Sequence, residues 1–219
     1  MPKLPKISDN EILLSVQDLK VNFRSEDEVA RAVDGVSFDV RREETLCLVG
    51  ESGCGKTVTA LSVMGLVPIP PGEITDGRVL FRGQNLLDFN DSAMQKIRGN
   101  QIAMVFQEPL TSLNPVFTIG DQIGEAIYTH EDIPESEVTR RSEQLLKDVG
   151  IASPAERLSD YPHQLSGRQR QRVMIAMALA CSPDLIIADE PTTALDVTVQ
   201  AQILRLLDSI QKLRAMSVL

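Results

Sequence analysis

The chain has 219 residues, 42% of them hydrophobic, and a formal net charge of −9. That length suits one domain, with room for a subdomain. The acidic charge and the absence of Trp argue against a nucleic-acid-binding surface, which needs a basic face and stacking aromatic rings. The first ten residues lack the apolar core of a signal peptide, and no apolar run approaches the length of a membrane span.

The three cysteines exclude a disulfide-rich scaffold. Cys47, Cys54 and Cys181 are scattered, odd in number and without metal-ligand spacing. We expect Cys47 and Cys181 to be small buried hydrophobic residues. This cysteine pattern fits a reducing, cytoplasmic setting.

Two strands are predicted at the N-terminal side. Residues 11–23 alternate loosely between polar and apolar side chains, and residues 33–40 place Val36, Phe38 and Val40 on one face. A charged turn at residues 25–28 separates the two segments. An antiparallel β portion is therefore expected first.

The next stretch, GESGCGKT from Gly50 to Thr57, fits the phosphate-binding pattern G-x-x-x-x-G-K-[ST]. The apolar run 45–49 predicts a buried strand before it, and a helix is predicted from about Lys56 to residue 64. Glycines let backbone N–H groups wrap a phosphate chain, and the helix start adds a partial positive charge. We expect Lys56 to reach the β- and γ-phosphates and the Thr57 hydroxyl to ligate Mg²⁺.

The middle of the chain changes from strands to helices. A proline-rich segment at 68–72 is expected to end the phosphate-loop helix. A strand over 77–81 with a turn at 82–84, a short helix over 92–98 and a buried strand over 102–106 follow. From 119 to 180 the pattern predicts helices over 119–128, 134–149 and 166–180, with a loop at 158–164. This block has no strand candidate, which indicates a helical insertion in an α/β domain.

An apolar run that turns abruptly acidic follows the helical block. Residues 185–190, LIIADE, predict a central strand of a mostly parallel sheet. Ligands lie at the carboxyl ends of such strands, so Asp189 is expected to hold Mg²⁺ and Glu190 to polarise the attacking water. Gln107 also ends a strand and can reach the metal or the water. A helix over 197–213 and a strand beginning at Met216 complete the chain, which we expect to be cut within the domain.

Ser166 and Gly167 open a second helix that can bind an anion. Ser166 is a good N-cap, and the first backbone amides of a helix are available to a ligand. The pair lies in the helical block, so its ligand need not be the same molecule's nucleotide. A head-to-tail dimer would place it over the partner's ATP.

Five motifs in this order resemble the ATP-binding subunits of ABC transporters. They are GESGCGKT at Gly50–Thr57, VFQEP around Gln107, LSGRQ at Leu165–Gln169, LIIADEP at Leu185–Pro191 and ALD at Ala194–Asp196. The wording GNQIAMVFQEPLTSLNP, YPHQLSG and ADEPTTALDVTVQAQIL is similar to the oligopeptide/dipeptide importer branch, which includes tandem subunits with two fused halves. The resemblance covers most of the chain. It implies one nucleotide-binding domain over residues 1–219: a phosphate-loop NTPase core, an antiparallel β portion and a helical subdomain at about 110–180.

The resemblance also assigns roles by position. ATP and its Mg²⁺ would be bound by Gly50, Ser52, Gly53, Cys54, Gly55, Lys56 and Thr57. Gln107 would be the switch glutamine that links the metal to the membrane subunits, Asp189 would support Mg²⁺, and Glu190 would activate water. Ser166, Gly167 and Gln169 would close on the partner's ATP, and Asp196 would lie at the dimer interface. Phe23 stands where the family has an adenine-stacking ring, although a core strand residue is an equal interpretation.

Two features depart from the family pattern. Arg168 replaces the second glycine of the signature motif, where a side chain would stand close to the partner's γ-phosphate. There it could add a positive charge, or its bulk could hold the dimer open; we expect it to impair closure. No histidine follows the last predicted strand, where the family has a switch histidine. The two histidines of the chain, His130 and His163, are expected at the surface. The chain is therefore expected to bind MgATP more readily than it hydrolyses it.

The resemblance implies an ATPase that energises import of peptides at the cytoplasmic face of the inner membrane. Its partners would be membrane-spanning permease subunits, a second ATP-binding domain and, indirectly, an extracytoplasmic solute-binding protein. The substrate is selected by other subunits, so glutathione, nickel and antibiotic peptides remain open. The alternatives are a soluble ABC-type ATPase acting on DNA or ribosomes, and a nucleotide-binding module with little turnover.

Overall fold

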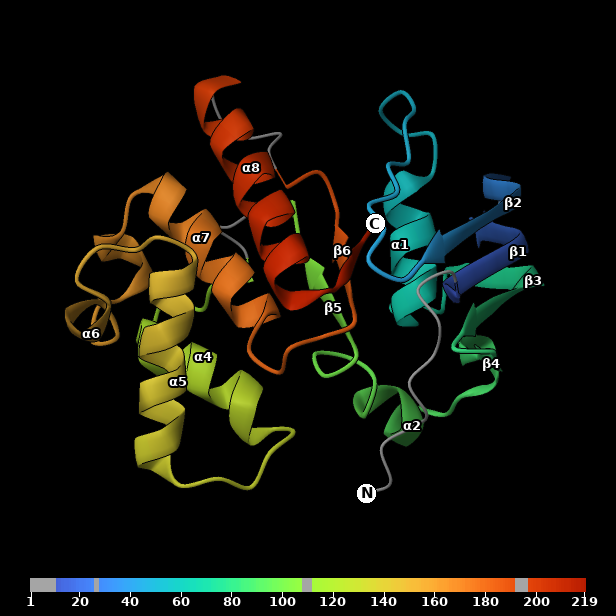
Figure 1. Ribbon diagram of the computed structural model, residues 1–219. Coiled ribbons are helices and arrows are strands. Elements are labelled where there is room, and N and C mark those ends of the chain that lie inside the picture. Colours follow the sequence, from blue (N-terminus) through green and yellow to red (C-terminus); the bar gives the residue numbers. More distant parts are fainter. Residues whose placement is uncertain (1–10, 26–27, 108–111, 192–196) are drawn as a thin grey trace. The chain divides into compact units, whose positions relative to one another are not determined.

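The computed structural model describes residues 11–219 except 26–27, 108–111 and 192–196, and leaves the side chains of 197–198 undescribed. The chain forms two compact units (Figure 1). The first contains the residues up to 94 together with 215–219, and the second contains residues 95–214. Each unit contains both strands and helices.

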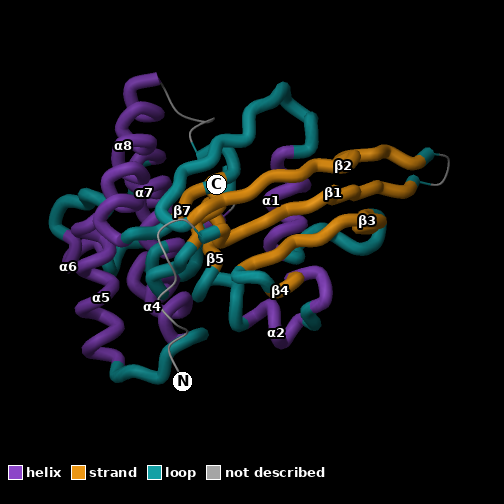
Figure 2. Tube along the Cα trace, turned by 45° about the vertical axis from the view of Figure 1, so that its right-hand side comes forward, coloured by secondary structure: helices purple, strands orange, loops and turns teal. Residues whose placement is uncertain are grey.

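The first unit is built on a four-stranded antiparallel sheet. Its strands are β1 (Ile12–Arg24), β2 (Val29–Arg41), β3 (Gly72–Phe81) and β4 (Gln84–Asn85), in the order β2-β1-β3-β4. Of these, β1, β2 and β3 are long neighbouring strands and β4 is short (Figure 2). In the central strand Leu14 is fully buried, opposite Val40 on one side and Phe81 on the other. The predicted antiparallel β portion is confirmed, and β3 begins five residues earlier than the pattern indicated.

Helix α1 (Lys56–Met64) packs against β2. The helix was predicted correctly, but the reason for its end was wrong. Gly65, with φ of 60°, ends the helix in the left-handed conformation, and its N–H donates to the carbonyl oxygen of Ser62 at 3.1 Å. The proline-rich segment at 68–72 lies beyond this cap. A 3₁₀ turn (η1, Leu86–Asp88) and a short helix (α2, Asp91–Gln95, three residues shorter at its end than predicted) follow β4.

The buried strand predicted over 45–49 does not form. Thr45 makes a single parallel bridge to Val218 of β7 (Ser217–Val218), and the Leu46 N–H donates to the Val218 carbonyl oxygen at 2.9 Å. Because β7 is only two residues long, the pairing has one bridge, and residues 46–50 have no regular secondary structure. Val49 is 93% exposed, and Cys47 is exposed rather than buried.

The second unit contains a parallel strand pair, β5 (Ile102–Val105) and β6 (Leu185–Ala188). The register places Val105 beside Ala188, so the carboxyl ends of the two strands coincide. Leu185 and Ile186 are fully buried, as expected for a parallel strand covered on both faces.

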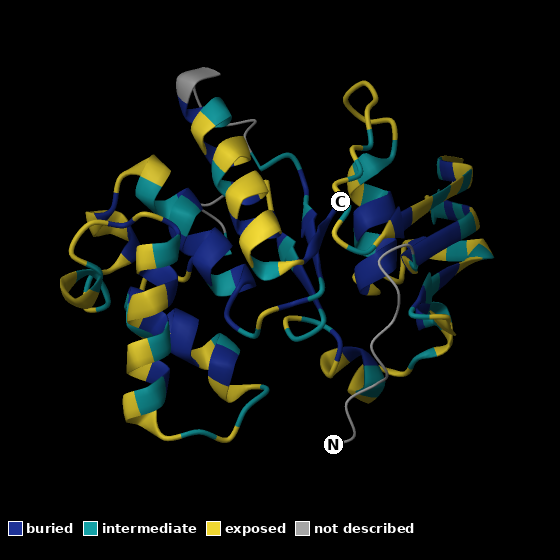
Figure 3. Cartoon of the chain, in the orientation of Figure 1, coloured by how far each residue is buried: buried dark blue, intermediate teal, exposed yellow. Residues whose placement is uncertain are grey.

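Helices make up the rest of the second unit. They are α4 (Ile119–Tyr128), α5 (Glu135–Asp148), α6 (Pro154–Arg157), the 3₁₀ turn η2 (Pro162–Gln164), α7 (Gly167–Ala178) and α8 (Val197–Arg214). α4, α5 and α7 pack on one another. In Figure 3 buried and exposed residues alternate along α5 and α8, the pattern of amphipathic helices. α6 and η2 were not predicted, because single turns carry too few residues for a periodic signal.

The predicted α/β class is confirmed: an antiparallel sheet is combined with a parallel pair and helices. None of the helices in the described residues has the length and apolar character needed to cross a membrane.

Candidate functional site

The phosphate-loop sequence forms a glycine-dependent turn into α1. Gly53 and Gly55 have φ of 82° and 91°, a region that other residues rarely adopt, and Gly55 is the N-cap of the helix. A Cβ at Gly55 would stand 2.2 Å from the carbonyl oxygen of Ala32 in β2. The second glycine of the motif is therefore fixed both by conformation and by the close approach of the neighbouring strand.

The polar side chains of this loop lie at its surface. The Lys56 ammonium, in the first turn of α1, donates to the carbonyl oxygens of Gly50 at 2.9 Å and Glu51 at 3.0 Å. It also lies 3.9 Å from the Cys54 sulfur. Ser52, Cys54 and Thr57 are exposed, so a ligand at the start of the helix can contact them.

Phe23 lies near the end of the central strand β1, where it faces Ala30 of β2 and Gly72 of β3. Its side chain is half-buried. Its ring would lie 3.2 Å from a Cβ at Gly72, so it packs along the backbone of that glycine. Both interpretations of this ring, adenine contact and strand packing, remain predictions.

The structure brings Gln107, Asp189 and Glu190 together at the carboxyl ends of β5 and β6. The Gln107 side-chain amide donates to the Glu190 carboxylate, with Nε2 and Oε2 2.9 Å apart. Asp189 is 8% exposed, and its N–H extends the strand ladder by donating to the Val105 carbonyl oxygen at 3.0 Å. A neutral amide thus holds a half-buried carboxylate at this sheet edge.

Glu190 adopts a strained backbone conformation. Its φ is 46°, in the left-handed region, which costs a residue other than glycine about 1–3 kcal/mol unless its surroundings hold it there. The next residue is Pro191, whose carbonyl oxygen accepts a hydrogen bond from Gln171 Nε2 at 2.8 Å. The sequence interpretation missed Gln171. The signal was an amide on the buried face of a helix, where periodicity predicts an apolar side chain.

The start of α7 is fixed by a capping box, as the Ser166 prediction implied. The Gln169 N–H donates to Ser166 Oγ at 3.4 Å, and the Gln169 side-chain oxygen accepts from the Ser166 N–H and hydroxyl, both at 2.9 Å. A Cβ at Gly167 would meet no atom of the described chain within 4 Å, and Arg168 is exposed. The start of α7 is therefore capped by side-chain hydrogen bonds and exposed at the surface.

Arg172, farther along α7, caps a neighbouring helix. Its Nη1 donates to the carbonyl oxygens of Val149 at 2.6 Å and Gly150 at 3.1 Å, at the end of α5. A cation at a helix C-terminus satisfies carbonyl groups that have no partner within the helix. This role was also missed, because the pairing depends on the packing of α5 against α7.

The histidines take no part in these contacts. His163 is exposed and stacks on the Tyr161 ring, with centroids 5.7 Å apart, in agreement with a surface position. His130 is half-buried rather than at the surface, and its Nε2 closely approaches Gly99. Asp196, expected at a dimer interface, lies outside the described residues. Among the residues described, no three His, Cys, Asp or Glu side chains gather closely enough to hold a metal ion by themselves.

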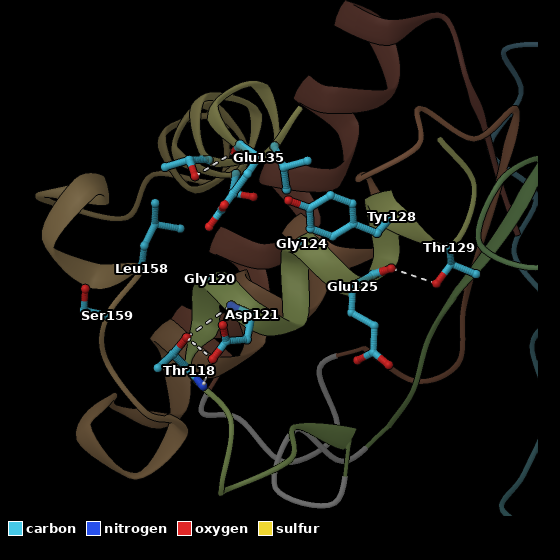
Figure 4. A pocket seen from close by; sticks show the side chains of 13 residues that line it. Thr118, Gly120, Asp121, Gly124, Glu125, Tyr128, Thr129, Glu135, Leu158 and Ser159 are labelled. Atoms are coloured by element: carbon cyan, nitrogen blue, oxygen red, sulfur yellow. Dashed lines mark hydrogen bonds between the residues drawn. The ribbon is translucent and has the colours of Figure 1, made fainter. Parts of the chain in front are cut away.

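A groove of about 680 Å³ runs between α4 and α5 (Figure 4). Its lining includes Thr118 and Asp121, which form the capping box of α4, and the acidic residues Glu125 and Glu135. Leu158 lies at one side. The groove combines acidic, hydroxyl and apolar groups on the surface of the helical part, by which we mean helices α4 to α7.

Comparisons with known proteins agree with these motifs. The sequence family described as "ABC transporter" matches residues 33–193. A probable peptide ABC transporter ATP-binding protein of Sinorhizobium fredii is 54% identical over 197 residues, which cover 90% of this chain and 59% of that protein. The dipeptide transport ATP-binding protein DppD of Bacillus subtilis is 52% identical over 209 residues, which cover 95% of this chain and 62% of that protein. The chain thus spans about three fifths of the length of these relatives.

A solved structure shares the fold. The dimeric, post-hydrolysis ATP-binding cassette MJ0796, bound to ADP and Pi, has a TM-score of 0.82 and 27% identity, covering 94% of this chain and 85% of that one. The α/β class expected from the motifs is thereby confirmed. The family match spans more than two thirds of the chain and includes the phosphate loop, the signature helix and the acidic strand end. The chain belongs to the ABC transporter family.

Proposed function

We propose that this chain is the ATP-binding and ATP-hydrolysing part of an importer of peptides or similar small solutes. The observation that carries the proposal is the 2.9 Å hydrogen bond between Gln107 and Glu190 at the ends of adjacent parallel strands. A carboxylate in this position suits general-base activation of water, because its hydrogen-bond partner is a neutral amide and not a cation that would neutralise its charge. The peptide-transport names of the relatives support the substrate class.

In this proposal the two compact units form one nucleotide-binding domain, as the match over residues 33–193 supports. Backbone N–H groups between Gly50 and Gly55 would bind the phosphate chain, with Ser52, Gly53 and Cys54 in contact. Lys56 would exchange the two loop carbonyls that it now contacts for phosphate oxygens. The ammonium is thus already aligned with the loop that would hold the anion.

The residues present fit a magnesium ion bound together with ATP. Mg²⁺ prefers oxygen ligands and is usually held by one or two protein groups plus phosphate oxygens and water. In this proposal the ligands would be the Thr57 hydroxyl, the Gln107 amide oxygen and the Asp189 carboxylate. Bound Mg²⁺ would neutralise charge on the phosphates. The Gln107 amide keeps its donor side on Glu190, which leaves its oxygen for the metal.

The second half of the site would come from another ATP-binding domain, arranged head-to-tail. Ser166 and Gly167 would offer the start of α7 to the partner's γ-phosphate, and Gln169 would hold that end in shape through the capping box. The dimeric state of the cassette MJ0796 supports this arrangement.

Arg168 is the residue of this half-site that departs from the family pattern. Its exposed side chain at the second position of the helix would stand close to the partner's nucleotide, where its bulk would hold the dimer open. Replacement by glycine (Arg168→Gly) is expected to raise the ATPase rate. An unchanged or lower rate would show that the arginine does not impede closure. A slow rate in the parent protein would favour the alternative of a nucleotide-binding module with little turnover.

The remaining partners would be membrane-spanning permease subunits, with a solute-binding protein acting through them, at the cytoplasmic face of the inner membrane. The helical part, with its groove between α4 and α5, would carry the docking surface. The test is whether the full-length protein co-purifies with membrane-spanning subunits and drives uptake of a labelled peptide into ATP-loaded vesicles. Co-purification with ribosomes or DNA, without uptake, would instead establish the alternative of a soluble ABC-type ATPase.

A further inference from the structure

The buried side-chain amide of Gln171 connects α7, the helix that begins in the signature motif, to the acidic residues that follow β6. Gln171 is 1% exposed, and its Nε2 donates to the Pro191 carbonyl oxygen at 2.8 Å. The residues that follow it on α7, Val173 to Ile175, are buried and apolar. A methionine would fill a similar volume without a polar group to desolvate, so the amide is retained at a cost that only its hydrogen bond offsets.

That hydrogen bond lies directly beside Glu190. On one side of Glu190 the Asp189 N–H donates to the Val105 carbonyl oxygen at 3.0 Å, and on the other side Gln171 holds the Pro191 carbonyl. Between these two anchors Glu190 has a φ of 46°. A residue other than glycine leaves the left-handed region unless hydrogen bonds hold the backbone on both sides of it. The two hydrogen bonds therefore set the direction of the Glu190 carboxylate.

We propose that Gln171 is a positioning residue for Glu190. It acts through the Pro191 backbone and does not touch the reacting atoms, and the inference rests on the proposed function of Glu190 as the general base. Gln171 is five residues after Ser166 on the same helix. One amide therefore ties the helix that would contact the partner's ATP to the carboxylate that would act on this chain's own ATP. A shift of α7 on dimer closure is transmitted to the orientation of Glu190.

The test compares Gln171→Met with a matched buried glutamine. Gln122 on α4 is 4% exposed, and its Nε2 donates to the carbonyl oxygens of Asn114 and Phe117, both at 3.0 Å. Gln122→Met thus removes hydrogen bonds from a side-chain amide to backbone carbonyls, as Gln171→Met does, but at another place in the same unit. Both variants are made in the full-length protein assembled with its membrane-spanning subunits. The measurements are the dissociation constant for MgATP, the melting temperature, and kcat for phosphate release per folded protein.

Gln171→Met is expected to lower kcat about 10- to 100-fold, because a general base displaced by about an ångström loses most of its effect. Its dissociation constant for MgATP should stay within a factor of about two. Gln122→Met should lower the melting temperature and leave kcat unchanged. An unchanged kcat for Gln171→Met, or an equal loss for both variants, would overturn the inference.

Gln171→Glu gives an independent result if the methionine variant does not fold. Glutamate has the same shape; its protonated carboxyl can donate to the Pro191 carbonyl, whereas its carboxylate cannot. Burial raises the pKa of such a carboxyl. The kcat of Gln171→Glu should therefore fall as pH rises through that pKa, on a limb that the wild type lacks. A pH profile parallel to the wild type would overturn the inference. Absence of phosphate release by the wild type itself would overturn the proposed function and this inference with it.

Discussion

The conformation of the phosphate loop gives a graded prediction for three glycines. Gly53 and Gly55 both have positive φ, 82° and 91°, but their surroundings differ. A Cβ at Gly53 would meet no atom of the described residues within 4 Å, whereas one at Gly55 would stand 2.2 Å from the Ala32 carbonyl oxygen. Gly83, in the turn between β3 and β4, has φ of 77° and equally open surroundings within the described chain, so it serves as a control outside the loop.

The expected magnitudes follow from these surroundings. Alanine in the left-handed region costs about 1–2 kcal/mol, so the Gly53→Ala loop relaxes when free and must be restored on binding. That cost corresponds to about 5- to 30-fold weaker MgATP binding, at 1.36 kcal/mol for each tenfold. Gly55→Ala adds a backbone clash that falls more than 1 Å short of an ordinary contact of 3.4 Å. Displacing the loop by that distance is expected to weaken binding more than about 100-fold.

Isothermal titration calorimetry with MgATP measures the three affinities, and thermal unfolding measures the three stabilities. Gly83→Ala should lose stability but keep the wild-type affinity for MgATP. A Gly55→Ala variant that binds MgATP as tightly as the wild type would show that the loop does not need glycine at this position. The proposed role of the loop would then be wrong. That role would also be refuted if Gly83→Ala lost as much affinity as the loop variants, because the effect would then be one of general stability.

Three further predictions concern contacts outside this loop. Arg214→Met removes a half-buried ion pair of 2.7 Å with the Asp148 carboxylate and should lower the free energy of unfolding by about 1–3 kcal/mol. Lys212→Met removes an exposed ion pair and should change the free energy of unfolding by less than about 1 kcal/mol; urea unfolding measures both. Thr118→Ala removes the α4 cap and should cost about 1 kcal/mol in the same assay without changing MgATP affinity; a changed affinity would contradict a purely structural role. Iodoacetamide should label Cys54 more slowly when MgATP is bound, and mass spectrometry distinguishes this site from Cys181. Because burial raises the pKa of the Cys181 thiol, Cys181 should react slowly at pH 8, faster at higher pH, and at a rate that does not depend on nucleotide.

Elements with a periodic apolar pattern were predictable from the sequence. The helices at 119–128 and 135–148 have bounds within a residue of the prediction, because each carries apolar side chains at helical spacing and a clear start or end. Gly150, with φ of 74°, follows the C-cap residue of the second helix. The strands at 102–105 and 185–188 were equally clear, since short apolar runs bounded by polar residues suit a covered parallel sheet.

The apolar run at 45–49 shows where this reasoning fails. A run of apolar residues predicts a strand only if neighbouring strands supply hydrogen-bond partners along its length. Here the partner β7 supplies one rung, at Thr45, and the rest of the run, with Val49 93% exposed, is unpaired with strand neighbours in the described chain. Pairing is a property of the fold and not of the segment.

The candidate site was predictable in its residue types but not in its contacts. Gln107 and Glu190 each end an apolar strand, so their meeting followed from the parallel pairing of β5 and β6. The left-handed backbone of Glu190 has no local sequence signal. Gln171 was visible only as an amide on the buried face of a helix, and its partner could not be predicted because Pro191 lies 20 residues away in sequence. A polar residue on the buried face of a helix can thus indicate a hydrogen bond to a backbone group that is distant in sequence.

The role of Glu190 as the general base is tested most directly by the rate of phosphate release from MgATP. The rate is measured for the full-length protein assembled with its membrane-spanning subunits, in the wild type and in Glu190→Gln. The variant keeps the shape of the side chain, and its amide oxygen can still accept the hydrogen bond from Gln107. We expect unchanged MgATP binding and a rate about 10²- to 10⁴-fold lower, because that is the contribution of a general base. A Glu190→Gln rate equal to the wild type would contradict the assignment of the catalytic carboxylate.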